Sequence, residues 1–468
     1  MIDIALIRDN PKWVKAQIAK LNDPAALERV DTIATLDQRR RALLGQAESV
    51  QSARNKLNKA VGMLRGNKQL DDTQKGKLAA AAAQAITAGD YERAAAALSG
   101  PPDEAPEADA DALDKLMASL GSIGASVERL NEEIKIVEER LNEQMLWLPN
   151  LPHESVPVFD SEDHNIAWPP EGALREFDFE PKAHWDLGPA LGIIDFERGV
   201  KIAGTRGYAL VGMGARLQRA LISFFLDRAH EKGFTELYVP YLVKEEMMYG
   251  AGQFPKFRDT VYFDPDANVY MLPTAEVAIT NLHRDEILDE SQLPLNYVAH
   301  TPCFRREKIS AGRDVRGIKR VHQFEKVEMY KFTSPETSYA ELESLVEAAS
   351  GLLRELQLPF RRLEIVTGDL GFSASKKYDL EVWSPGCKEW LEVSSCSNTE
   401  EFQARRANIK YRSAEGKKTR FVHTLNGSGL ATPRVLIAIL ENYQQADGSV
   451  IVPEALRPYL GADIIAAP

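Results

Sequence analysis

The sequence has few cysteines, no long apolar run and no glycine-rich phosphate loop, and each shortage excludes a class of protein. Three cysteines in 468 residues are too few, and too odd in number, for a disulfide framework, so we expect a reducing compartment. No stretch of roughly 20 apolar residues is present, which argues against a membrane-spanning helix. The opening residues, MIDIALIRDNPKW, lack a basic leader followed by an apolar run, so we expect no secretory signal and a cytoplasmic location.

Positive charge is also in deficit, with 57 Lys and Arg against 69 Asp and Glu, a net charge of −12. This balance argues against indiscriminate binding of nucleic acid, but it is compatible with a local basic surface. The length is too great for one small core and predicts two or three domains.

A seven-residue hydrophobic repeat dominates the N-terminal third. Residues 1–26 form a short helical segment in which Asp9-Asn10-Pro11 signals a helix start. Apolar residues then recur every seven positions, at Leu36, Leu43, Val50, Leu57 and Leu64. A second stretch steps by three and four, at Leu113, Leu116, Leu120, Ile123, Val127, Leu130, Ile134, Val137 and Leu141. These patterns predict an antiparallel coiled coil of two helices, reaching roughly 60 Å.

Two features of this arm, residues 1–150, need separate interpretation. Residues 66–110 are alanine-rich and then rich in proline and acids, which predicts a helical insertion at the tip followed by a mobile connector. The first helix carries nine Lys/Arg against four acids over residues 27–68, and Arg40 and Arg54 fall on the apolar seam. A solvated coiled-coil face and a surface that follows a phosphate backbone are both compatible with this charge.

Three prolines in LPNLPHESVPVF end the helical part and open a second domain over residues 151–468. A helix at about 213–232, the strand TELYVPYL and further elements in irregular order predict an α+β fold with a large antiparallel sheet and flanking helices. Neither GxxxxGK[ST] nor GxGxxG occurs, so side chains would have to hold any bound nucleotide.

The strongest concentration of positive charge lies in CFRREKISAGRDVRGIKRVHQFEKVEMYKF, Cys303 to Phe332. Residues 305–326 hold eight Lys/Arg against three acids. The ends of this stretch alternate like strands, whereas the connecting segment has two glycines and too much charge to be buried. The pattern predicts a basic hairpin.

Alternation places Arg305 and Glu307 on one face of this hairpin, and it places Phe324, Lys326 and Glu328 on one face of the return strand. An arginine fork suits phosphate oxygens, and Phe324 offers a plane on which a base can stack. The hairpin is therefore a candidate nucleotide site, and an exposed basic hairpin is the alternative interpretation.

The stretch WLEVSSCSNTEEF offers oxygen ligands of the kind that Mg²⁺ prefers, at Glu392 and Ser395. Strict alternation would pair Glu392 with Ser394 instead, so the joint use of Glu392 and Ser395 requires a bulge or a strand end. Ser397 and Glu400 also match a helix capping box, and both interpretations are compatible.

Two further stretches read as helix starts. In LNGSGLATPRVLIAILENYQQ, Thr432-Pro433 begins an apolar helix, and Arg434 in its first turn opposes the helix dipole. An anion bound at this helix start would resolve the conflict, and a surface arginine is the alternative. Pro273-Thr274 followed by Glu276 is also an ordinary helix start.

Taken together, these stretches resemble the class II aminoacyl-tRNA synthetases, and most closely the seryl-tRNA synthetase family of bacterial type. The coiled coil resembles that family's arm, which reaches for the long variable arm of its tRNA. Residues 213–240 resemble motif 1, part of a dimer interface, residues 303–332 resemble motif 2, and residues 425–448 resemble motif 3.

The resemblance implies a homodimer that activates L-serine with ATP to seryl-adenylate and transfers serine to the 3′ end of tRNA(Ser), and of tRNA(Sec) where present. It implies Arg305 and Arg434 as catalytic residues, and Mg²⁺ held through ATP at Glu392 and Ser395. The implied serine-binding residues are Thr274, Ala275, Glu276, Arg305, Glu328 and Ser428. The implied ATP-binding residues are Arg305, Arg306, Glu307, Val321, Phe324, Glu392, Val393, Ser394, Ser395 and Arg434.

A zinc site and two other functions are the alternatives to this interpretation. Cys303, Cys387 and Cys396 form no CxxC pair and have no neighbouring histidine in the sequence, so we expect no zinc. A paralogue that loads a carrier protein would generally lack the long arm. A non-catalytic regulator on the same fold should have lost the charged site residues, which are all present here.

Overall fold

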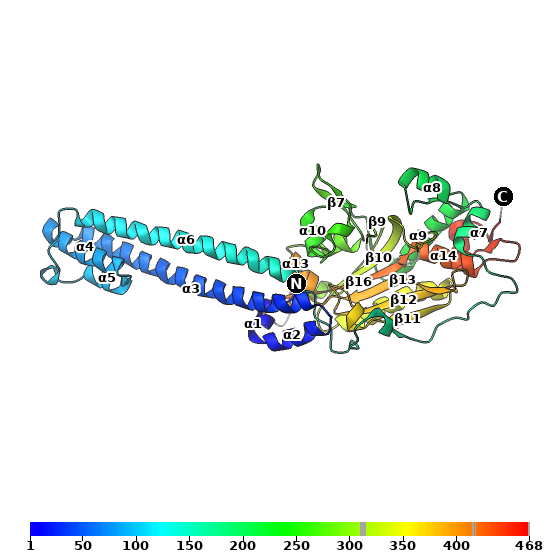
Figure 1. Cartoon of the computed structure of the whole chain (residues 1–468), viewed down its shortest axis with the longest axis horizontal. Coiled ribbons are helices and arrows are strands. Elements are labelled where there is room, and N and C mark those ends of the chain that lie inside the picture. Colours follow the sequence, from blue (N-terminus) through cyan, green and yellow to red (C-terminus); the bar gives the residue numbers. More distant parts are fainter. Residues whose placement is uncertain (309–314, 414–415, 417, 467–468) are drawn as a thin grey trace. The chain divides into compact units, whose positions relative to one another are not determined.

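The structure is a computed structural model that describes residues 1–308, 315–413, 416 and 418–466 (Figure 1). Contacts divide the chain into two compact units, Met1–Leu27 with Leu146–Pro468, and Glu28–Met145. The first residues of the predicted arm therefore group with the C-terminal part of the chain. In that unit α1 (Ile4–Asp9) and α2 (Pro11–Ala19) surround Asn10, whose side chain accepts from Trp13 N and caps α2 as the sequence predicts.

The arm is an antiparallel pair of long helices, α3 (Pro24–Gly66) and α6 (Ala112–Leu146) (Figure 1). Arg29 donates to Gln144 Oε1 at 2.7 Å and Arg39 to Glu133 at 3.1 Å, so partners descend in number along α6 as they rise along α3. The predicted seam is buried at positions that include Leu43, Leu57, Leu64, Leu116, Leu120, Ile123, Val127, Ile134 and Leu141.

The two arginines on the seam are accommodated in different ways. Arg40 pairs with Asp37 and Glu138, so its charge is neutralised beside the apolar row. Arg54 lies over Gly124, where a Cβ would come within 3.2 Å of the guanidinium. A glycine at that position provides the room that the arginine occupies.

The alanine-rich tip folds into α4 (Asp72–Thr87) and α5 (Tyr91–Ala97), which pack on the adjoining ends of α3 and α6 (Figure 1). Ala79 and Ala82 are fully buried in this cluster, beside Leu57 and Leu116. Small side chains let the helices approach closely, which explains the alanine bias of the segment.

The larger unit, Met1–Leu27 with Leu146–Pro468, is built on an eight-stranded sheet in the order β1-β11-β12-β13-β16-β10-β9-β4. Its strands are β1 (Ile166–Ala167), β11 (Phe360–Glu364), β12 (Lys376–Ser384), β13 (Glu389–Asn398), β16 (His423–Ala431), β10 (Gln323–Thr333), β9 (Leu295–Phe304) and β4 (Thr235–Leu237). All neighbours pair antiparallel except β4 and β9, which run parallel. The predicted strand at 235–242 ends at Leu237, just before Pro240, which has no N–H for a ladder.

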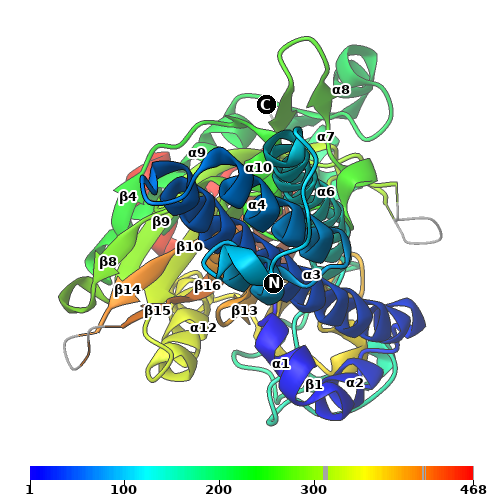
Figure 2. The same cartoon turned by 90° about the vertical axis from the view of Figure 1, so that its left-hand side faces the viewer.

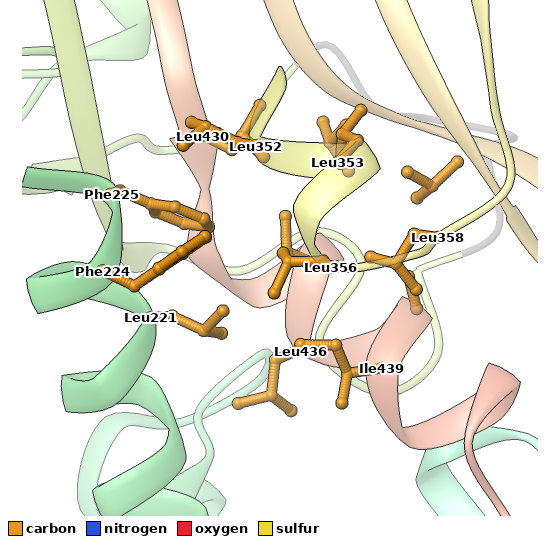
Figure 3. Packing of buried hydrophobic residues seen from close by; sticks show 14 of the residues in the cluster. Leu221, Phe224, Phe225, Leu352, Leu353, Leu356, Leu358, Leu430, Leu436 and Ile439 are labelled. Atoms are coloured by element: carbon orange, nitrogen blue, oxygen red, sulfur yellow. The ribbon is translucent and has the colours of Figure 1, made fainter. Parts of the chain in front are cut away.

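Three helices cover one face of the sheet: α9 (Met213–Glu231), α12 (Ser338–Glu355) and α14 (Thr432–Asn442). Figure 3 shows Phe224 and Phe225 of α9, Leu352 and Leu353 of α12, and Leu436 of α14 converging in one apolar cluster. On the opposite face, α11 (Glu276–Thr280) and α13 (Phe402–Ala407) pack on part of β10 and β16, beside Tyr330.

Smaller elements complete the unit. The short helices are α7 (His184–Ala190), α8 (Phe196–Ala203), α10 (Glu245–Gly250), α11 (Glu276–Thr280), α13 (Phe402–Ala407) and α15 (Arg457–Leu460). One small sheet contains β15 (Thr419–Phe421), β14 (Lys410–Arg412) and β8 (Ile287–Asp289), which lie side by side in Figure 2. Another contains β5 (Leu242–Val243), β7 (Val269–Met271) and β6 (Phe263–Asp264). Two further pairs are β17 (Val450–Ile451) with β18 (Ile464–Ile465), and β2 (Ile194–Asp195) with β3 (Ala209–Leu210). Within the described residues, no helix combines the length and the apolarity that crossing a membrane requires.

Replacing Leu436 by alanine should lower the free energy of unfolding by about 2–5 kcal/mol, because its fully buried side chain would leave a cavity between α14 and its neighbours. Denaturant unfolding followed by circular dichroism measures the change. Leu282→Ala, at a position 43% exposed, is the control and should change stability by less than about 0.5 kcal/mol. Equal effects of the two substitutions would contradict the described core.

Candidate active site

A cavity of about 580 Å³ lies over the central strands of the sheet. A Cβ at Gly427 would lie 2.9 Å from Leu345 of α12, so this glycine faces the covering helices. Its neighbours Asn426 and Ser428 therefore point to the other face, and both line the cavity. Ser428 pairs across the sheet with Glu328, which lines the cavity as well.

Most of the residues that the sequence singled out meet at this cavity. Those that line it are Thr274, Glu276, Arg305, Glu307, Val321, Phe324, Glu328, Glu392, Val393, Ser395, Ser428 and Arg434. Three others do not. Ala275 is buried in an apolar cluster, Arg306 is exposed to solvent, and Ser394 donates to Ser428 O at 2.6 Å inside the sheet.

The bulge that joint use of Glu392 and Ser395 requires is present in β13. Glu392 pairs with Glu381 of β12, but the next β12 residue, Leu380, pairs with Ser394, so Val393 is the extra residue. The inserted residue reverses the alternation, and Glu392 and Ser395 consequently face the cavity together. The capping-box interpretation is wrong, because Ser397 is a β13 residue and α13 begins only at Phe402.

Two carboxylates, a hydroxyl and a lysine form one end of the cavity. Thr274 Oγ1 donates to Glu328 Oε2 at 3.3 Å and accepts from Lys326 Nζ at 2.9 Å. Lys326 also forms an ion pair with Glu328, and both side chains are nearly inaccessible to solvent. The predicted helix start is confirmed here, since α11 begins at Glu276.

Glu276 has a strongly perturbed acidity. Its carboxylate accepts from Gln403 Nε2 at 2.6 Å and from Asn426 Nδ2 at 2.9 Å. Burial, reinforced by the negative charge of Glu328, raises the pKa of Glu276 to about 7. A carboxyl held in this way is ready to receive a cation, because an ammonium would restore its ionised form.

Cations and an aromatic ring line the cavity as well. The Arg305 guanidinium lies over the Phe324 ring, 5.1 Å from its centroid, and Arg305 Nε donates to Pro273 O at 3.3 Å. Glu307 accepts from Arg320 Nη1 at 3.4 Å. The tip of the predicted hairpin, residues 309–314, lies outside the described residues.

Arg434 connects the first turn of α14 to both sides of the cavity. It donates from Nη1 to Glu392 O at 2.6 Å and from Nε to Lys319 O at 3.3 Å. Burial opposes ionisation of Glu392, but the charges of Arg434, Lys377 and Arg305 outweigh it and hold the pKa of Glu392 below its usual value. The predicted helix start is confirmed, since α14 begins at Thr432; Ala431 is its N-cap, and Thr432 Oγ1 donates to Glu325 O.

Sequence reasoning missed several cations of the site: Lys319, Arg320, Lys326 and Lys377. Strand alternation had placed Lys326 on the face of Phe324 and Glu328, and this was the available signal. The expectation that the hairpin carries too much charge to be buried is wrong at Lys319, which is 7% exposed and forms an ion pair with Glu389. Lys377 had no local signal, because its position depends on the pairing of β12 with β13.

The surroundings of Cys387 could not be predicted from neighbouring residues in the sequence. Cys387 lies beside His184 and Glu441, residues far from it in the chain, with the three potential ligand atoms within 4.8 Å of one another. The absence of zinc stays a prediction. Cys303 and Cys396 are buried.

Comparison with known proteins gives this geometry a family. The chain matches the tRNA synthetase class II core domain (G, H, P, S and T) over residues 260–443, and the seryl-tRNA synthetase N-terminal domain over residues 1–98. It is 52% identical over 462 residues to the serine–tRNA ligase of Roseiflexus sp. (strain RS-1), covering 98% of each chain. It is 50% identical over 467 residues to that of Roseiflexus castenholzii, covering 99% of each.

Two solved structures share the whole fold. The seryl-tRNA synthetase from Pyrococcus horikoshii, complexed with ATP, has a TM-score of 0.86 and 36% identity, with 100% of both chains covered. The cytoplasmic serine–tRNA ligase from Naegleria fowleri, in complex with AMP, has a TM-score of 0.80 and 29% identity, with 100% of this chain and 99% of that chain covered.

The antiparallel sheet and its cavity are those of a class II aminoacyl-tRNA synthetase. The predicted α+β fold with an N-terminal helical arm is thereby confirmed. Since relatives at about half identity span its whole length, the chain belongs to the seryl-tRNA synthetase family.

Glu276→Gln should stabilise the substrate-free protein at pH 8 by about 1–3 kcal/mol and have little effect near pH 4. The folded-state pKa of Glu276, about 7, exceeds its ordinary value of 4.5, so stability is lost as pH rises through this window. Glutamine cannot ionise, so the substitution removes this loss of stability at high pH. Denaturant unfolding at the two pH values measures it, with exposed Glu154→Gln as control, and a stabilisation that does not depend on pH would contradict the assigned acidity.

Proposed function

We propose that this chain activates L-serine with ATP to seryl-adenylate and then transfers the seryl group to the 3′ end of tRNA(Ser). The observation that carries the proposal is one cavity lined by buried carboxylates, several cations, an aromatic ring and oxygen ligands, in a chain of this family. The relatives named above are serine–tRNA ligases, which favours the synthetase over a carrier-loading paralogue or a non-catalytic regulator.

The end formed by Thr274, Glu276 and Glu328 suits serine. Two carboxylates offer acceptors for the substrate ammonium and hydroxyl, with Ser428 and Arg305 lining the same space. A site built to hydrogen-bond the hydroxyl would reject alanine, because a buried polar group would lose its partner.

The cationic end suits the nucleotide. Phe324 with Arg305 above it offers a plane and a charge, and Arg434 lines the same cavity. In the proposed step a serine carboxylate oxygen attacks the α-phosphorus of ATP and pyrophosphate leaves. The arginines stabilise the charge that develops, and the fixed cavity aligns the reactants.

Glu392 and Ser395 fit a Mg²⁺ ion carried by the polyphosphate. Their oxygen donors share the cavity face because of the bulge at Val393, and cations keep the carboxylate of Glu392 ionised. A bound Mg²⁺ would supply positive charge to the polyphosphate, while Arg434 holds the backbone of Glu392 in place.

We further propose that the arm binds the tRNA and that the protein acts as a homodimer in the cytoplasm. Positive charge concentrates on α3, and the coiled coil is a rigid support for a surface that follows phosphates. Near motif 1, Tyr238 is 88% exposed, Ile202 82% and Leu242 57%, and a second copy would cover them. Charging of tRNA(Sec), where that tRNA is present, belongs to the same proposal.

The first test is ATP–pyrophosphate exchange with each of the twenty amino acids, followed by aminoacylation of tRNA(Ser). Exchange with serine only, together with tRNA charging, is the expected outcome. Serine exchange without charging would favour the carrier-loading paralogue. No exchange with any amino acid would favour the regulator.

Arg305→Ala should abolish adenylate formation, with a loss of at least about 100-fold in exchange, because it removes charge stabilisation at the α-phosphate. The mutant should keep the wild-type oligomeric state by size-exclusion chromatography. Arg420→Ala, an exposed arginine paired with Glu336, is the matched control and should stay within about twofold of wild type. Activity like wild type in Arg305→Ala would overturn the assignment.

Ser395→Ala should raise the Mg²⁺ concentration needed for half-maximal exchange by about tenfold or more, because one oxygen donor is lost from the polyphosphate end. A Mg²⁺ titration of the exchange rate at saturating serine measures this shift. Ser394→Ala is the control, since its hydroxyl points into the sheet. An unchanged Mg²⁺ requirement in Ser395→Ala would show that Ser395 is not a ligand of the metal.

A further inference from the structure

A buried hydrogen-bonded cluster outside the cavity connects three segments of the larger unit. Its centre is Glu441 near the end of α14, whose side chain is fully buried together with that of His184. Oε1 of Glu441 accepts from His184 N and Nδ1, each at 2.9 Å, and from Cys387 Sγ at 3.3 Å. Oε2 accepts from Ser384 Oγ and from the backbone N–H groups of Gly386 and Cys387. A buried carboxylate with this many donors is a fixed anchor.

The far side of the His184 ring holds the return segment of the motif 2 hairpin. Ile318 N donates to His184 Nε2 at 3.1 Å. Gly317, at φ +65°, lies so close that a Cβ there would be 1.9 Å from Nε2. The neighbouring Trp185 ring carries the Arg316 guanidinium at 4.4 Å and the Lys319 ammonium at 5.1 Å from its centroid.

This anchored segment is a wall of the cavity. Ile318, Lys319, Arg320 and Val321 all line it. The carbonyl of Lys319 accepts from Nε of Arg434, the arginine in the first turn of α14. One helix therefore carries the arginine and, seven residues or about 10 Å further along, the carboxylate that fixes the arginine's partner segment.

We propose that His184 is a positioning residue for adenylate formation: through its Nε2 it fixes the backbone at Ile318, and thereby the carbonyl that orients Arg434. The inference rests on the proposed function of the cavity. His184 lies outside the cavity lining, so it acts through Ile318 and Lys319 rather than on substrate.

The hydrogen bonds also assign the ring tautomer. Because Ile318 N–H is a donor, Nε2 must be unprotonated, so the proton lies on Nδ1 and is donated to Glu441. Nδ1 is the atom that a metal shared with Cys387 and Glu441 would need. Burial, with the charge of Glu441, raises the pKa of Cys387 to about 12, so the thiol keeps its proton and donates. The cluster is satisfied by hydrogen bonds alone.

Two substitutions distinguish a role of His184 in positioning Ile318 from a role in merely filling the buried space beside Glu441. The amide of His184→Gln reaches the place of Nε2 and keeps an acceptor for Ile318 N–H. The amide of His184→Asn reaches the place of Nδ1, keeps the bond to Glu441 and leaves Ile318 N–H unpaired. If His184 served only to donate a hydrogen bond to Glu441, His184→Asn would be the more active variant. If His184 positions Ile318, His184→Gln is the more active variant.

The test is steady-state ATP–pyrophosphate exchange by the full-length protein, with thermal unfolding and deuterium exchange of the peptide containing Ile318. In His184→Asn we expect kcat to fall about 10- to 100-fold, the KM for serine to stay within about twofold, and deuterium uptake at that peptide to rise. His184→Gln should recover most of kcat. Cys387→Ser keeps a donor to Glu441 and should resemble wild type.

Other outcomes would contradict either the positioning role or the proposed function. The positioning role would be overturned if kcat of His184→Asn equalled or exceeded that of His184→Gln. It would also be overturned if deuterium uptake at the Ile318 peptide were unchanged in both variants, a result that can be obtained even where a variant is too unstable for kinetics. If kcat of Cys387→Ser fell as severely as that of His184→Asn and added Zn²⁺ restored it, this would also overturn the positioning role and favour a metal site. Absence of exchange in the wild-type protein would instead overturn the proposed function.

Discussion

The antiparallel pairing of β10 with β9 and β16 is the constraint on which the site depends. It sets Glu328 opposite Ser428 and Ala299, and alternation then sends Glu328 and Ser428 to one face while Met329 and Gly427 face the helices. The apolar face is covered by α9, α12 and α14, which bury the core. The opposite face can then hold charged side chains at fixed spacing without disturbing that core.

A second constraint is that the site gathers buried charges before any substrate arrives. Ionised groups away from water are tolerated only when they are paired or hydrogen-bonded. Here Lys326 pairs with Glu328, Lys319 with Glu389, and Arg434 reaches Glu392. Glu276 accepts from two amide donors, but its burial and the negative charge of Glu328 outweigh these bonds and raise its pKa. The least compensated carboxyl is therefore the one best suited to a positively charged ligand.

The arm and the site differ in how far they could be predicted. The seam of the coiled coil follows from local periodicity, because a helix brings residues three and four apart onto one stripe, and the buried positions match. The bulge in β13 was also foreseeable, since Glu392 and Ser395 share a face only if the alternation slips. Arg306, Ala275 and Ser394 were implied by resemblance alone, and none of them lines the cavity.

By itself the sequence predicted the coiled coil, the α+β class and several of the residues that line the cavity, because helix stripes, strand alternation and helix starts are properties of consecutive residues. Only the tertiary structure decided which distant groups neutralise one another. Lys377 enters the site through the pairing of β12 with β13, and His184, Cys387 and Glu441 meet although hundreds of residues separate the first from the last. Such contacts depend on strand order and helix packing, which no short stretch of sequence contains.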